Sequence, residues 1–162
     1  MRTRPLVIEN ARIIDPSRNL DEVGAIIVRD GAVAACGRDA LNAGHPDGAD
    51  VIDARGLLAI PGLVDARVFI GEPGFEHRET IHSVGEAAAA GGVTSILTMP
   101  DTNPVIDEVA LAQFVMRTAR ETCAVNVFPS AALTRGLLGQ EMTEIGILTE
   151  AGVHTFTEGR RT

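Results

Sequence analysis

The chain has 162 residues, 45% hydrophobic and 22% charged, a balance typical of a globular protein that can bury a sizeable core. Its formal net charge is −8 and all 14 basic residues are arginine, which excludes lysine chemistry within these residues, including a Schiff base or a carbamylated metal ligand. An acidic chain without basic clusters argues against nucleic acid or an anionic membrane as a partner. Its start has no apolar signal region and no run approaches the roughly 18 apolar residues that span a bilayer, so we expect a cytoplasmic protein.

The first 60 residues predict strands. Segments 6–14 and 23–36 are rich in β-branched residues, and Asp30-Gly31 predicts a tight hairpin turn inside the second segment. Residues 38–50 are predicted to form a polar loop, and a short strand then precedes a turn at Gly56. We therefore expect one domain over residues 1–60 and a second over residues 61–162.

From residue 61 the pattern alternates between strands and helices. The predicted strands are 62–69, 93–100, 124–133 and 153–157, and the predicted helices are 76–92, 106–122 and 139–152. Such alternation indicates a parallel sheet covered by helices. It amounts to half of a (β/α)8 barrel, which typically needs roughly 250 residues. We expect an incomplete barrel that forms the front part of a longer protein.

Five motifs in order carry a family resemblance: PGLVD (61–65), EPGFEHRETI (72–81), AAAAGGVTS (87–95), MPDTNP (99–104) and FPSAALT (128–134). Together they resemble the class I dihydroorotases of the amidohydrolase superfamily. The resemblance implies an α/β fold, a TIM barrel with a small N-terminal β-sandwich to which residues 1–60 would belong. It also implies the family's reaction, the reversible closure of carbamoyl aspartate to dihydroorotate in pyrimidine biosynthesis.

That reaction uses zinc to generate hydroxide and to polarise a ring amide. In the family the first barrel strand ends Asp-x-His-x-His, because alternate residues of a strand point the same way and both imidazoles reach one metal. Here the two histidine positions are Arg67 and Phe69. Arginine is a permanent cation without a lone pair, and phenylalanine has no ligand atom.

Other family positions are also replaced. The substrate-binding arginine is Gly71, and the asparagine that holds the substrate carboxylate is Asp101; with Asn103 these are the remnants of the substrate positions. The metal-binding aspartate falls on Gly159, or on Glu158 if one residue is deleted. We therefore predict no catalytic residue, no metal ligand and no cofactor within this chain.

The resulting expectation is a catalytically silent dihydroorotase-like protein, a pseudoenzyme. The resemblance implies a structural role in an oligomer with aspartate transcarbamoylase or a dihydroorotase paralogue. Two alternatives stay open. One is an active zinc-dependent dihydroorotase, or another cyclic amidohydrolase, with an atypical site. The other is an anion-binding module with Arg67 and Arg160 at the barrel mouth.

Three further expectations concern single side chains. His77 and His82 are five residues apart in the predicted helix 76–92, so they should point to different faces and share no metal. His154 lies in a predicted strand and is interpreted as a satisfied core or rim histidine. Arg67 is hypothesised to form a buried pair with Asp65 or Glu158 that fills the former metal cavity.

Overall fold

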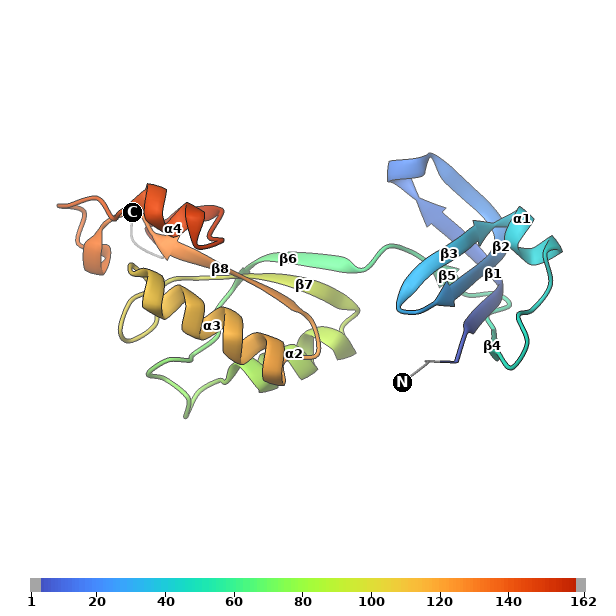
Figure 1. Ribbon diagram of the computed structural model, residues 1–162, viewed down its shortest axis with the longest axis horizontal. Helices are drawn as coiled ribbons and strands as arrows, with labels where there is room; N and C mark the ends of the chain where they lie inside the picture. The colour runs from blue at the N-terminus through green and yellow to red at the C-terminus, as the bar shows by residue number, and fades with distance from the viewer. Residues whose placement is uncertain (1–3, 160–162) are drawn as a thin grey trace. The chain divides into compact units, whose positions relative to one another are not determined.

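The computed structural model describes residues 4–159 and divides into two compact units, one ending at Pro61 and the other starting at Gly62 (Figure 1). Each unit has buried clusters of its own side chains. The units are described separately below.

The described part of the first unit forms one mixed sheet. Its strands are β1 (Leu6–Asp15), β2 (Leu20–Arg29), β3 (Ala32–Gly37), β4 (Asp50–Asp53) and β5 (Leu58–Ala59), with a short 3-10 helix, η1 (Pro16–Arg18), after β1. The order is β3-β2-β1-β4, and β5 also pairs with β1. The hairpin at Asp30-Gly31 is confirmed, because both residues have the positive φ angles, 51° and 77°, that tight hairpin turns need.

Two expectations for this unit differ from the structure. Where a polar loop was predicted, helix α1 (Arg38–Asn42) forms, because Ala40 packs into a buried cluster with Val7, Ala25 and Ile27. The β-sandwich is not confirmed, since strands β1 to β5 make a single sheet among the described residues.

The second unit is a parallel sheet of the order β6-β7-β8-β9. Its strands are β6 (Leu63–Val68), β7 (Val93–Thr98), β8 (Asn126–Ala132) and β9 (Thr155–Thr157). They alternate with α2 (Ile81–Ala90), α3 (Val109–Thr122) and α4 (Ile145–Glu150), and η2 (Arg135–Leu137) follows β8. The structure thus confirms the predicted alternation and shows the parallel sheet of a half-barrel.

The helices begin later than predicted, for local reasons. Helix α2 begins at Ile81 because the Thr80 hydroxyl accepts a hydrogen bond from the N–H of Ser83 at 3.1 Å, which caps the helix. Asp107 does not lie in the first turn of α3. Its Oδ2 accepts a hydrogen bond from the N–H of Gly136 at 2.8 Å instead.

The core of the second unit lies between the sheet and the helices. Fully buried Ile70, Ile81 and Val115 belong to one apolar cluster with Leu148 of α4. Helices α2 and α3 contact each other and lie on one face of the sheet (Figure 1). Because the strands are parallel, their carboxyl ends meet at one edge of the layer, where barrel enzymes place their chemistry.

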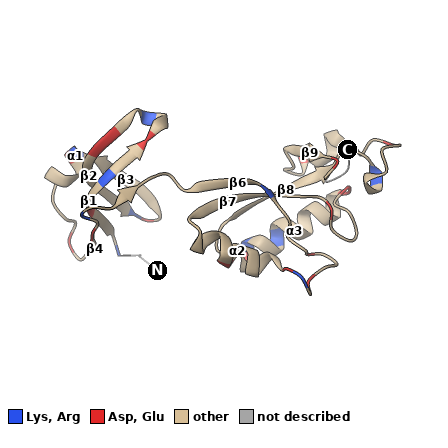
Figure 2. Cartoon of the chain, turned by 180° about the vertical axis from the view of Figure 1, so that it is seen from behind, with Lys and Arg blue, Asp and Glu red and all other residues tan. Residues whose placement is uncertain are grey.

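Charged residues are scattered over both units and do not gather into one basic patch in the view of Figure 2. Among the described residues, no helix is both long and apolar enough to cross a membrane.

Candidate site at the carboxyl ends of the strands

Phe69, one of the two predicted metal-ligand positions, is covered by its own chain. Val68 packs against the core and Phe69 is half-buried, whereas Arg67 is exposed. The guanidinium carbon of Arg78 lies 4.9 Å from the Phe69 ring centroid, within cation–π range, and the Phe75 ring centroid lies 6.1 Å away. Both neighbours come from the loop after β6.

The acidic residues of that loop hold backbone and hydroxyl groups. Glu72 Oε2 accepts a hydrogen bond from the N–H of Ile81 at 3.0 Å, at the start of α2. Glu76 Oε1 accepts one from the N–H of Gly74 at 2.8 Å, which lowers the pKa of Glu76 below its usual value. Glu79 accepts one from the Ser83 hydroxyl. These contacts anchor the loop, so that Arg78 is held over Phe69.

Gly71 leaves no room for the arginine that the resemblance would place there. It is buried, its φ is +66°, and a Cβ atom added to it would lie 2.3 Å from the carbonyl oxygen of Glu79. A side chain at this position therefore requires the loop to move.

Glu158, the alternative position of the metal-binding carboxylate, follows β9. Its Oε2 accepts a hydrogen bond from the Thr134 hydroxyl at 3.0 Å, whereas its Oε1 is buried without a hydrogen-bond partner among residues 4–159. A Cβ atom added to Gly159 would lie 3.7 Å from Cβ of Asp101. The structure thus brings the segments that follow β7 and β9 close together.

Asn103 lies on the loop after β7, where it contacts the loop after β6. The N–H of Asn103 donates to the carbonyl oxygen of Pro73 at 3.0 Å. A Cβ atom added to Gly74 would lie 2.0 Å from the carbonyl oxygen of Asn103. In the structure Asn103 therefore packs the 99–104 turn against the loop that carries Arg78.

The hypothesis of a buried Arg67 pair is wrong. The Arg67 side chain is exposed and forms no ion pair within the described part of the chain. Arg67 contacts Asp65 through its backbone instead, since the N–H of Arg67 donates a hydrogen bond to Asp65 Oδ1 at 3.0 Å. Arg160, named in the anion-binding alternative, lies outside the described residues.

His77 and His154 are placed differently from the prediction, whereas His82 lies in the predicted helix. His77 lies in a turn before α2, with its ring edge against Phe75 at 6.4 Å between centroids. His82 is in α2, where its Nδ1 donates to the carbonyl oxygen of Thr122 at 2.8 Å. His154 precedes β9 instead of lying in it and is exposed, at the opposite end of the sheet from Phe69.

These side chains do not fit a zinc site. Zinc takes three or four nitrogen, sulfur or oxygen ligands from the protein, and Arg67 and Phe69 supply none. Among residues 4–159, no group of three or more His, Cys, Asp or Glu is placed to hold a metal ion. Sequence reasoning missed Arg78 and Thr134, because only the folded loop and the β8–β9 pairing bring them to Phe69 and Glu158.

Comparison with solved structures defines the class. The chain resembles an L-hydantoinase (dihydropyrimidinase) from Arthrobacter aurescens with a TM-score of 0.78 and 27% identity, over 96% of this chain and 32% of that one. A D-hydantoinase shares the fold, with a TM-score of 0.67 at 20% identity, over 94% of this chain and 32% of that one. The fold is thus that of the barrel amidohydrolases.

Sequence comparison then gives the family. Residues 56–162 match the dihydro-orotase-like family model, and the chain belongs to that family. It is 46% identical to a dihydroorotase of Solibacter usitatus and 48% identical to one of Pelobacter propionicus, over 95% and 96% of this chain. It spans only 35% and 36% of those relatives.

Proposed function

We propose that the chain is part of a catalytically silent dihydroorotase-like protein that supports pyrimidine biosynthesis in the cytoplasm as a structural partner of aspartate transcarbamoylase. In this proposal the parallel sheet belongs to a closed (β/α)8 barrel with a small β-sandwich beside it. Relatives named dihydroorotase that are about 40–50% identical over most of the chain support the pathway.

The main support for the absence of catalytic activity is the packing of Phe69. A ring under the Arg78 guanidinium and beside Phe75 offers a metal neither a lone pair nor an open coordination position. A bound metal stabilises developing charge by several kcal/mol in hydrolases of this kind, so its loss removes the main catalytic contribution. Arg67, two residues before Phe69, adds an exposed positive charge that opposes a divalent cation.

The structural role is supported by what the chain keeps. The second unit keeps a buried apolar core, and it keeps glycines that approach backbone closely, including Gly74 against Asn103. A protein that keeps a buried core while its ligand positions are replaced retains the use of its outer surface. That surface is what an assembly partner requires.

The test is zinc content and turnover of the purified full-length protein. We expect no stoichiometric zinc and no cyclisation of carbamoyl aspartate, with or without added zinc, where the Pelobacter propionicus relative serves as the positive control. Bound zinc together with turnover that a chelator abolishes would overturn the silence and favour the active-enzyme alternative, with ligands from elsewhere in the protein.

The partner is tested separately by sedimentation with aspartate transcarbamoylase. We expect a complex that forms equally in the presence of a chelator. If the two proteins sediment independently at micromolar concentration, the proposed structural partnership is wrong. The proposed lack of turnover would be unaffected.

A further inference from the structure

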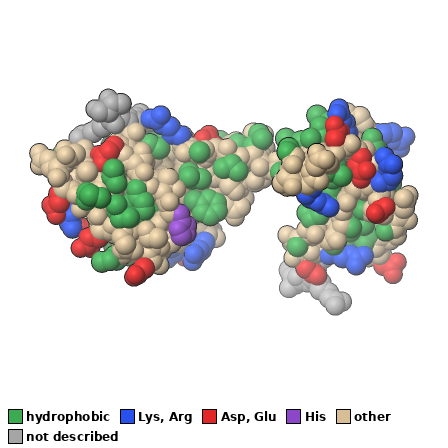
Figure 3. Space-filling model, turned by 90° about the horizontal axis from the view of Figure 1, so that it is seen from above, with side chains coloured by type: hydrophobic (Ala, Val, Ile, Leu, Met, Phe, Trp, Pro, Cys, Tyr) green, Lys and Arg blue, Asp and Glu red, His purple; other side chains and the backbone are tan. Residues whose placement is uncertain are grey.

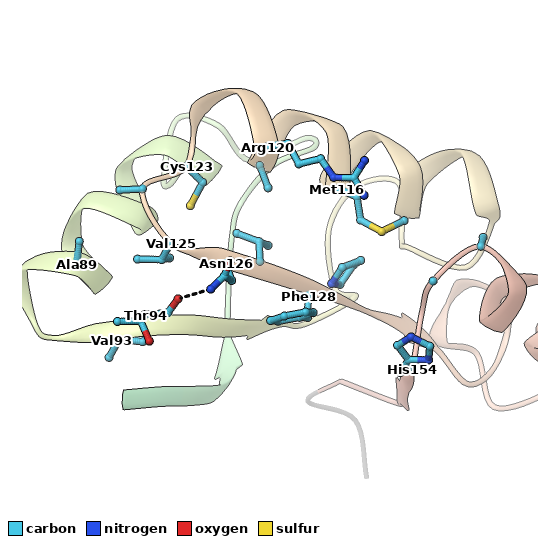
Figure 4. A pocket seen from close by; sticks show the side chains of 16 residues that line it. Ala89, Val93, Thr94, Met116, Arg120, Cys123, Val125, Asn126, Phe128 and His154 are labelled. Carbon is cyan, nitrogen blue, oxygen red and sulfur yellow. Dashed lines mark hydrogen bonds between the residues drawn. The ribbon is translucent and has the colours of Figure 1, made fainter. Parts of the chain in front are cut away.

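A second candidate site lies at the other end of the parallel sheet. A cavity of about 800 Å³ opens there, within the range of about 300–1,000 Å³ typical of small-molecule sites. It is bounded by the first residues of β7 and β8, the last turns of α2 and α3, and the segment that leads into β9. Figure 4 shows Met116 and Arg120 projecting from α3, with Phe128 on β8 and His154 before β9.

The cavity lining is apolar with a few polar groups. Its apolar side chains include Val93, Met116, Val125 and Phe128, and the Phe128 ring is 51% exposed. Apolar side chains also reach the surface of this unit in the view of Figure 3. The amide of Asn126 already donates to the carbonyl oxygen of Thr94 at 3.2 Å, so it helps to hold β8 beside β7.

The charge of the lining differs from that of the chain. The chain carries 22 acidic residues, yet none of the sixteen residues that line this cavity is acidic. Its ionisable side chains are Arg120, His154 and the thiol of Cys123. Arg120 and His154 are exposed and form no ion pair among residues 4–159, so Arg120 brings an unneutralised positive charge to an apolar cavity.

We propose that this cavity binds a small organic anion, with its carboxylate on Arg120 and its apolar body against Met116 and Val127. A guanidinium pairs with a carboxylate through two parallel hydrogen bonds. The inference goes beyond the proposed function and does not depend on it, since the cavity lies at the opposite end of the sheet from Phe69.

Binding can be measured through the protection of Cys123 from alkylation. Cys123 lines the cavity and is only partly buried, whereas Cys36, the other cysteine of these residues, belongs to the first unit and serves as an internal control. In the full-length protein, iodoacetamide labelling of each cysteine is followed by peptide mass spectrometry. The probes are benzoate and its uncharged counterpart benzamide.

We expect benzoate to slow labelling of Cys123 but not of Cys36, and benzamide to protect about ten-fold more weakly. Hydrogen bonds to charged groups are worth about 1.5–3 kcal/mol, which corresponds to ten-fold or more in affinity. Arg120→Ala should remove the preference for benzoate. Arg117→Ala is the matched control, because Arg117 is an exposed arginine one turn earlier in α3 that does not line the cavity.

Three results would overturn the proposal. The first is no protection by benzoate at millimolar concentration. The second is equal protection by benzoate and benzamide, which would mean that the cavity does not select charge. The third is the same effect from Arg117→Ala as from Arg120→Ala. Circular dichroism of each variant separates lost binding from lost folding.

Discussion

The two ends of the parallel sheet in the second unit have opposite character. At the carboxyl end, functional positions are filled by contacts within the chain: Arg78 covers Phe69, and the Thr134 hydroxyl binds Glu158. At the amino end, Arg120 and His154 line an open cavity without a carboxylate among its lining residues. Barrel enzymes carry their chemistry at the carboxyl end, where this chain fills the functional positions with its own side chains. The cavity that could hold a ligand lies at the amino end.

The largest expected effect compares one glycine from each end. Gly71→Ala at the carboxyl end should destabilise by about 2–4 kcal/mol, because it adds left-handed strain of about 1 kcal/mol to an overlap with the Glu79 carbonyl of about 1–3 kcal/mol. Gly92→Ala at the amino end has a similar positive φ, 76°, but open space around the new Cβ, so about 1 kcal/mol is expected. Urea denaturation measures both, and equal losses would contradict the close packing assigned to the carboxyl end.

A smaller effect compares two arginines. Arg78→Ala should cost about 0.5–1 kcal/mol, the usual range for an exposed cation–π contact. Arg120→Ala should change the free energy of unfolding by less than about 0.5 kcal/mol, the usual range for surface substitutions. A double-mutant cycle of Arg78→Ala with Phe69→Leu isolates the contact. A coupling energy of zero would show that Arg78 does not cover the former ligand position.

The smallest effect is a pH dependence at the carboxyl end. The N–H of Gly74 lowers the pKa of Glu76 in the folded state, so this contact stabilises the fold above the pKa of an unfolded glutamate, about 4.3. The stabilisation is lost as the pH falls through the lower folded pKa.

Glu76→Gln should therefore lower stability at pH 7 and reduce the loss of stability on acidification. Denaturation at a series of pH values tests this, and NMR titration of the Glu76 carboxyl carbon gives its pKa directly. A folded pKa at or above the unfolded value would contradict the assignment.

Much of the second unit follows from the sequence. Strands are marked by β-branched runs, and the end of α2 by Gly91-Gly92, because these signals act within a few residues. The predicted beginning of α2, residue 76, was wrong. The helix begins only after Thr80, because the Thr80 hydroxyl accepts a hydrogen bond from the N–H of Ser83 and caps it there. In the first unit, α1 formed where a loop was predicted, since burial of Ala40 against three strands outweighs weak local propensity.

The sequence by itself determined the order of elements, the parallel sheet, and the absence of imidazoles from positions 67 and 69, since each depends on residue type and spacing alone. Only the tertiary structure decided that Arg78 covers Phe69, that Arg67 is exposed, and that Arg120 and His154 line one cavity. Those contacts join residues that lie far apart in the chain or belong to an irregular loop. Their geometry depends on packing across the whole unit, which no local pattern encodes.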